Sequence, residues 1–198
     1  MRDHEEVSDG IDLVWIPLGA GPGGALVRWS GRLYELFAAT AHRRRARPLY
    51  HSALLVTLDG SLTTIEMAPV WVTRGERGVV AEGPVGWRHL GRCRLFRYEV
   101  RCWPNGSIPD LGAAVGRPTR VSADPASARR LLGLVPSFPT HTWGRDELGT
   151  GDMWNSNSLT SWLLTRSSLD PGGLHPPEHG RAPGWDAGVV AGRAGGQG

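Results

Sequence analysis

Three polar side chains in separate parts of the sequence have the types that acyl transfer requires. His51 and Glu66 lie in two β-rich apolar segments that flank the turn signal Asp59-Gly60, and Ser158 lies at the start of a later apolar segment. Acyl transfer needs a nucleophilic hydroxyl or thiol, a base within hydrogen-bond reach and a third group that orients the base. The sequence therefore offers Ser158 as nucleophile, His51 as base and Glu66 as orienting carboxylate.

The position of Ser158 adds an oxyanion site to this set. The polar run Asn155-Ser156-Asn157 precedes it, and the apolar spacing that follows predicts a helix over 158–166. The first backbone N–H groups of a helix are unpaired and lie at the positive end of its dipole, so they can stabilise an oxyanion. Asn157 and Tyr50 are candidates for an additional donor to that oxyanion.

Each of these residues also has an ordinary structural explanation. His51 could be a half-buried strand residue with a satisfied hydrogen bond, and Glu66 could pair with one of the many arginines. The polar residues 155–158 could form only the N-cap of the helix that follows, which is the usual role of Asn and Ser there. The sequence leaves both explanations open.

Arginine and tryptophan side chains are candidates for substrate binding. Segment 94–103 alternates, which predicts a strand with one wet face that carries Arg97 and Arg101 and one buried face. That wet face is either the wall of a polar pocket or simply solvated. Trp154, in the loop before the predicted helix, would shape the entrance through which substrate reaches the site. Arginines there would favour substrates that carry a carboxylate or a phosphate.

Two familiar motifs are better explained as loops. Residues 19–24 match the dinucleotide pattern G-x-G-x-x-G, but no helix follows at once and no acidic residue ends a second strand at the required distance. Residues 175–179 spell the zinc pattern H-x-x-E-H, but Pro176 and Pro177 forbid the helix that would align the two histidines. We therefore expect no organic cofactor and no metal.

Patterning also indicates the elements that must position these residues. Their order predicts an α+β domain with a single antiparallel twisted sheet packed against helices. Residues 1–170 would form the domain, and the Gly/Pro-rich residues 171–198 a tail that wraps irregularly over it and is disordered at its extreme end. The predicted strands are 11–17, 51–57, 62–67, 78–80 and 94–103, the predicted helices 32–45, 122–132 and 158–166, and the predicted long loops 104–122 and 136–153.

Composition excludes several classes of protein. The 198 residues, 40% hydrophobic and 21% charged, suit one globular domain, and two cysteines are too few for a disulfide scaffold or a zinc-finger set. All 22 basic residues are arginine, yet no nucleic-acid-binding module accompanies them, so we expect a solvated arginine-rich surface and no nucleic-acid partner. No apolar run reaches membrane-spanning length and the N-terminal segment lacks a secretory signal, which predicts a cytoplasmic protein with reduced cysteines.

Three segments together resemble the circularly permuted papain-like (NlpC/P60-type) superfamily, which includes lecithin:retinol acyltransferase and the YiiX-like proteins. Residues 50–60, YHSALLVTLDG, resemble the family's histidine strand and turn, and residues 64–67, TIEM, resemble the next strand with its polar third member. Residues 154–164, WNSNSLTSWLL, resemble the Asn-Cys box and its helix. The resemblance covers roughly residues 11–103 and 123–166 in layout.

The resemblance implies a permuted papain-like fold and two alternative functions. One is a hydrolase or acyltransferase that acts on an amide, thioester or ester of a small molecule or peptide through a covalent intermediate on Ser158. The other follows from a departure, because Ser158 stands where the family has its cysteine. A serine gains too little from the helix dipole and needs His51 as a true general base. The alternative is therefore a catalytically inactive domain that serves as a binding or interaction module.

Overall fold

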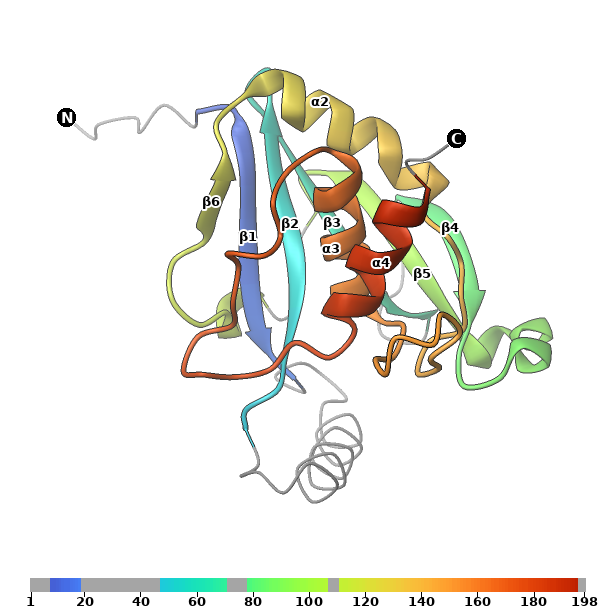
Figure 1. The fold of residues 1–198 in the computed structure, drawn as a ribbon. Helices are drawn as coiled ribbons and strands as arrows, with labels where there is room; N and C mark the ends of the chain where they lie inside the picture. The colour runs from blue at the N-terminus through green and yellow to red at the C-terminus, as the bar shows by residue number, and fades with distance from the viewer. Residues whose placement is uncertain (1–7, 19–46, 71–77, 107–110, 196–198) are drawn as a thin grey trace.

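The protein is an α+β domain in which one antiparallel sheet carries helices on one face (Figure 1). The computed structural model describes residues 8–18, 47–70, 78–106 and 111–195. The sheet has six strands in the order β4-β5-β3-β2-β1-β6, which confirms the predicted fold class. The strands are β1 (Gly10–Pro17), β2 (Tyr50–Leu58), β3 (Ser61–Pro69), β4 (Val79–Pro84), β5 (Arg97–Pro104) and β6 (Thr119–Ser122). The helices are α2 (Pro125–Leu134), α3 (Ser156–Arg166) and α4 (Trp185–Ala194).

The hairpin formed by β2 and β3 confirms the turn that the sequence predicts. Leu58 pairs with Ser61, and the two residues between them, Asp59 and Gly60, have φ values of 51° and 73°. Two consecutive positive φ angles give a turn whose twist matches that of the flanking strands, and Asp-Gly adopts it at low cost. This turn fixes the register of β2 and β3, and the register determines which of their side chains share a face of the sheet.

Helix α3 is central to the core and is buried on all sides. Every residue from Ser156 to Leu164 is buried, and its apolar side chains pack with those of β1, β2, β3, β5 and α2 in one continuous cluster. Such an element must satisfy its polar groups within the protein, because no water reaches them. The polar first turn of α3 is thus the most demanding part of the fold.

Helix α2 begins at Pro125, within the predicted helix 122–132, and Asp124 caps it. The Asp124 side chain accepts hydrogen bonds from the backbone N–H groups of Ala126 and Ser127, at 3.1 and 3.0 Å, and Pro125 occupies the first helical position. Proline loses nothing there because that N–H would be unpaired in any helix.

Helix α4 lies within the segment for which the sequence predicted an irregular tail. It packs closely on α3, because a Cβ atom at Gly188 would overlap Ser161 Oγ and the Ser158 carbonyl oxygen. A Cβ at Gly192 would press on the side chain of Thr165. The glycines that obscured the helix in the sequence are therefore what allow it to approach its neighbour.

Three further expectations differ from the structure or lie outside it. The predicted loop 104–122 contains β6, a short edge strand paired with β1. The predicted helix 32–45 and the glycine-rich segment 19–24 lie outside the described residues. None of the helices that the structure describes combines the length and the apolar character needed to cross a membrane.

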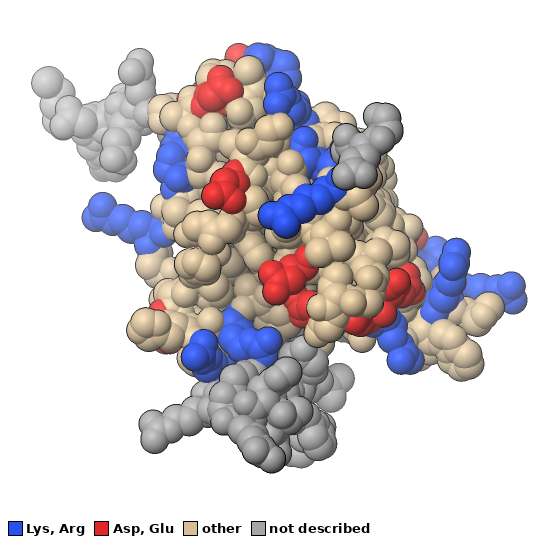
Figure 2. All heavy atoms as spheres, viewed as in Figure 1, with Lys and Arg blue, Asp and Glu red and all other residues tan. Residues whose placement is uncertain are grey.

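The visible surface carries both signs of charge. Figure 2 shows basic side chains spread around the molecule with acidic ones between them, and a gathering of basic side chains at the corner beyond β4. Interspersed charge of this kind fits the solvated, arginine-rich surface expected from the sequence.

A matched pair of substitutions tests the close approach of α3 and α4. We expect Gly188→Ala to lower the free energy of unfolding by about 2 kcal/mol or more, because the two helices must move apart. Gly133→Ala, in α2 where a Cβ would meet nothing within 4 Å, should instead raise it by about 0.5–1 kcal/mol. Urea denaturation of both variants measures the difference, and equal effects would contradict the packing described.

Candidate functional site

The side chains of His51 and Ser158 lie on opposite sides of the sheet. Ser52 faces α3, since its Oγ donates to Asn157 Oδ1 at 2.8 Å and lies 2.9 Å from Thr160 Oγ1. Successive side chains of a strand point to opposite faces, so His51 points away from α3. Ala53, on the same side as His51, packs with Val14 and Ile16 in a separate small core. The structure therefore does not bring the predicted base to the predicted nucleophile.

His51 has the environment of a strand residue in an apolar setting. Its partner in β1 is Ile16, and burial lowers the pKa of the imidazole to about 4. The neutral imidazole is consequently the dominant form at neutral pH. His51 is thus a half-buried strand residue, as the ordinary explanation expects, but its ring forms no hydrogen bond with the residues that the structure describes.

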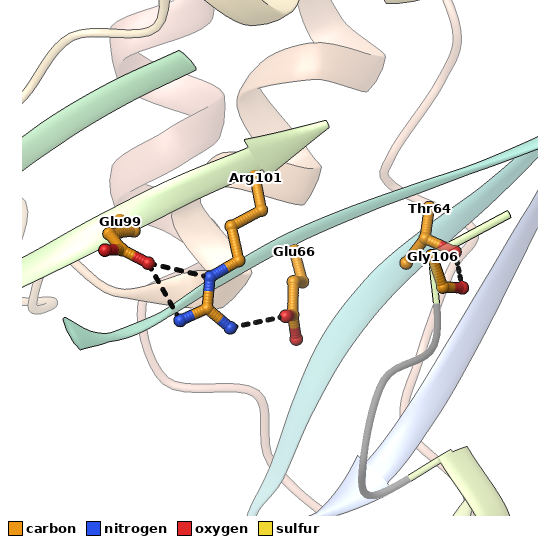
Figure 3. Close-up of polar contacts among 5 residues, drawn as sticks. All are labelled: Thr64, Glu66, Glu99, Arg101 and Gly106. Carbon is orange, nitrogen blue, oxygen red and sulfur yellow. Dashed lines mark hydrogen bonds and ion pairs between the residues drawn. The ribbon is translucent and has the colours of Figure 1, made fainter. Parts of the chain in front are cut away.

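Glu66 lies on the same face as His51 but is engaged with arginine. Glu66 is paired with Arg101 across β3 and β5, and its Oε1 accepts from an Arg101 NH group at 2.8 Å (Figure 3). The Arg101 Nε and another terminal nitrogen lie 3.0 and 2.9 Å from Glu99 Oε2. The guanidinium thus lies between two carboxylates, and the Glu66 carboxylate is engaged in an ion pair with it.

This ion-pair cluster corrects the predicted wet face of segment 94–103. Arg101 is 0% exposed and Glu99 1% exposed, whereas Phe96, on the face predicted to be buried, is 42% exposed. The alternation is real, but the charged side chains are paired and covered. In this arrangement Arg101 is not accessible to a substrate from solvent, so the structure gives no support to its predicted role in substrate binding.

Ser158 forms part of a helix cap. Its Oγ accepts from the backbone N–H of Asn155 at 3.1 Å and donates to the Gly184 carbonyl oxygen at 2.7 Å. The Asn155 side chain in turn accepts from the N–H of Asn157 at 2.9 Å, which completes a capping box. The side chain of Ser158 is fully buried, and its proton is directed at a carbonyl oxygen that cannot act as a base.

The side chain that does point from the first turn of α3 to β2 is Asn157. Its Nδ2 donates to the carbonyl oxygens of Tyr50, at 3.0 Å, and Pro183, at 2.8 Å, while Oδ1 accepts from Ser52. The contact between strand and helix is therefore made by Ser52 and Asn157. Sequence reasoning missed this pair because the β2 segment is apolar on both faces, so its alternation does not reveal which face meets the helix.

Residues 183–185 cover the start of α3. Their three successive carbonyl oxygens accept hydrogen bonds from four side chains of the helix and its cap: Asn155, Asn157, Ser158 and Ser161. Gly184 has a φ of 91°, where glycine is favoured, and its N–H donates to Asp152 Oδ2 at 2.7 Å. The place where an oxyanion would bind is occupied by the chain itself.

The remaining predicted residues near the helix are also engaged. Tyr50 is 3% exposed and donates its hydroxyl to Glu178 Oε2 at 3.2 Å; burial and this carboxylate raise its pKa. Trp154 is 1% exposed and stacks on Phe138 with 5.0 Å between ring centroids. Neither lines an open entrance. The H-x-x-E-H segment around Glu178 contains no helix, as its prolines predict.

An open, polar pocket lies elsewhere, between the end of β4 and residues 140–147. Its volume is about 610 Å³. Arg97, the predicted substrate-binding residue that does reach solvent, lines it and pairs with Glu82 at 2.9 Å, and His141 Nδ1 lies 3.0 Å from Glu147 Oε2. The other lining residues are Gly83, Pro84, Arg88, Gly91, Arg92, Thr140 and Thr142.

Comparison with known proteins does not assign a family or a function to the chain. No family model matches the sequence, and comparison with curated proteins and with solved structures gives no match. Across the residues that the structure describes, no three His, Cys, Asp or Glu side chains are grouped so that they could hold a metal ion.

The hydrogen bonds of Asn157 give a sharp prediction for an isosteric change. Asn157→Asp replaces the donating amide nitrogen by a carboxylate oxygen that faces two carbonyl oxygens in a buried site. We expect it to lower the free energy of unfolding by about 3 kcal/mol or more. Asn105→Asp, in an exposed turn, is the control and should change it by less than about 0.5 kcal/mol. A tolerated Asn157→Asp would mean that this amide is not bound as described.

The lowered pKa of His51 predicts acid sensitivity with a definite sign. The pKa is about 4 in the folded state and 6.5 without the protein environment, so the unfolded state binds more protons between these pH values. The free energy of unfolding should fall by up to about 3 kcal/mol as the pH is lowered through this window. Urea denaturation along the window should show that His51→Gln flattens this dependence, whereas His89→Gln, at an exposed histidine, does not.

Proposed function

We propose that the chain is a non-catalytic binding module with a permuted papain-like layout, the second of the two functions that the resemblance implies. One observation carries this proposal: the first turn of α3 meets β2 through Ser52 and Asn157, and residues 183–185 cover the junction. Neither side chain of that pair is a nucleophile with a base beside it.

The contacts of the polar side chains argue against acyl transfer in this arrangement. Attack by a serine requires a base that removes its proton, and the Ser158 proton is held by a backbone carbonyl. The N–H groups of Asn157 and Ser158, which would otherwise stabilise an oxyanion, already donate to Asn155 Oδ1 and the Asn155 carbonyl. Substrate would have to displace residues 183–185 before it could contact any of these groups.

The pocket beside β4 is the place where such a module would bind its ligand. Its volume lies within the range typical of small-molecule sites, roughly 300–1,000 Å³. Arg88 and Arg92 line it, and neither forms an ion pair with any residue that the structure describes. Guanidinium groups bind carboxylate and phosphate through charge-assisted hydrogen bonds. We therefore infer a small-molecule or peptide ligand that carries one of these anionic groups.

Chemical labelling tests the absence of a nucleophile. A fluorophosphonate probe should leave Ser158 unmodified, as read by intact mass and peptide mapping. In a Cys93→Ser background, Ser158→Cys should react with iodoacetamide only after unfolding, because the side chain is 0% exposed. The exposed Cys93 of the natural chain, which should react at once, is the positive control. Labelling of Ser158, or rapid alkylation of folded Ser158→Cys, would restore the catalytic hypothesis.

Ligand binding tests the pocket. We expect O-phosphoserine and N-acetylglutamate, but not the uncharged N-acetylglutaminamide, to shift amide resonances around His141 and Thr142 in nuclear magnetic resonance titrations. Arg92→Ala should weaken this binding about tenfold, since one charge-assisted contact is lost. Arg129→Ala, on the exposed face of α2, is the matched control and should leave it unchanged. Equal binding of charged and neutral probes would contradict an anion site.

A further inference from the structure

A small lobe at the edge of the sheet exposes an unusual share of large apolar side chains. Residues 85–97 leave the end of β4 through two 3₁₀ turns, Arg88–Arg92 and Arg94–Phe96, and return as β5. We call this segment the 85–97 lobe. In Figure 1 it is the green coil that projects beyond β4, away from the helices. Neither turn contains a single buried residue.

The apolar exposure of the described residues is concentrated there. Trp87 is 61% exposed, Leu90 39%, Leu95 65% and Phe96 42%, and the adjoining strand adds Val79 and Val80. The only other large apolar side chain that is comparably exposed in the described part of the chain is Val190 in α4. Scattered apolar side chains need no explanation, but four large ones exposed within residues 87–96 are typical of an interaction surface.

The lobe is held in this conformation at its neck. The Val85 N–H donates to the Phe96 carbonyl at 2.8 Å, and the Gly86 N–H donates to the Trp143 carbonyl at 2.9 Å. Arg145 Nε donates to the Gly86 carbonyl at 2.6 Å. These hydrogen bonds hold the backbone at the base of the lobe in a defined conformation, which fixes where the exposed apolar side chains lie.

The charge of the lobe has one sign. It contains Arg88, Arg92, Arg94 and Arg97, and no acidic residue occurs between Glu82 and Glu99. Glu82 pairs with Arg97, while the other three arginines form no ion pair with any described residue. The gathering of basic side chains at this corner is visible in Figure 2.

We propose that the 85–97 lobe docks on an anionic lipid surface. Trp87, Leu95 and Phe96 would enter the interfacial region, where tryptophan rings are favoured, and the arginines would contact lipid phosphates. Each basic residue close to such a surface contributes about fivefold to binding, so the three unpaired arginines predict a preference of about 100-fold for anionic over neutral lipid.

The composition of the lobe favours this partner over two others. Nucleic acid offers stacking to aromatic rings but little for exposed leucines such as Leu90 and Leu95. A second copy of the lobe would bring two sets of unpaired arginines together, which like-charge repulsion opposes. An anionic membrane matches both properties at once, because it combines an apolar interior with a negative surface.

Sedimentation with vesicles tests the proposal. We expect the protein to bind phosphatidylcholine vesicles that contain about 30 mol% phosphatidylglycerol, and to bind pure phosphatidylcholine about 100-fold less. Added salt should weaken the binding to anionic vesicles because it screens the arginines. Trp87→Ser and Leu95→Ser should each weaken it at least about fivefold. Val190→Ser, which removes an exposed apolar side chain from α4, should have no effect.

Cys93 supplies a natural reporter in the lobe. It is exposed, whereas Cys102 is half-buried and burial raises the pKa of its thiol, so a maleimide fluorophore should label Cys93 selectively. The emission of a polarity-sensitive fluorophore at Cys93 should shift to shorter wavelength with anionic vesicles and not with neutral ones.

Several outcomes would overturn the proposal. They are an absence of binding to anionic vesicles, equal binding to neutral ones, or binding that Trp87→Ser and Leu95→Ser leave unchanged. A change of oligomeric state in these variants, seen by analytical ultracentrifugation, together with unchanged vesicle binding would assign the lobe to self-association. Arg88 and Arg92 line the pocket beside β4 and Trp87 and Leu95 do not, so the apolar variants separate the two proposals: they should still bind O-phosphoserine while losing vesicle binding.

Discussion

The amide of Asn157 is the contact on which the arrangement of α3, β2 and α4 depends. A helix buried on all sides cannot leave its first polar groups to solvent, and here a strand carbonyl, a strand hydroxyl and the carbonyl oxygens of residues 183–185 satisfy them. Those carbonyls can reach the helix only if the chain turns through Gly184 and if α4 then lies close to α3 at Gly188. The placement of α4 therefore follows from the polarity of the first turn of α3.

A second buried polar group holds the other face of the sheet. Arg101 is fully buried and is compensated by Glu66 and Glu99, which come from paired strands. Because side chains alternate along a strand, a slip of one residue between β3 and β5 would move Glu66 to the opposite face and leave the guanidinium short of a partner. The cluster thus destabilises a shifted register of β3 and β5, whereas the apolar side chains around it discriminate less between registers.

The sequence predicted local secondary structure better than it predicted which face of a strand meets a helix. The Asp59-Gly60 hairpin and the helices predicted at 122–132 and 158–166 each depend on neighbouring residues, and the structure contains them, although α2 begins three residues later and α3 two residues earlier than predicted. The pairing of His51 with Ser158 depended instead on which face of β2 meets α3. Tyr50, Ser52, Leu54 and Val56 alternate with His51, Ala53, Leu55 and Thr57, and both sets contain apolar residues. Only the hydrogen bonds of Ser52 and Asn157, which join distant segments, decide between them.

Because the buried polar groups already form hydrogen bonds with one another, a ligand gains little free energy by binding to them. At the start of α3 the hydroxyl and amide groups already have partners, so a ligand there would have to break as many hydrogen bonds as it made. The lobe beyond β4 is the opposite case, because its apolar side chains face water and Arg88, Arg92 and Arg94 form no ion pair with any described residue. Covering those side chains removes apolar surface from water without breaking any contact within the protein. The gain in free energy on binding is therefore greatest at the edge of the sheet formed by β4.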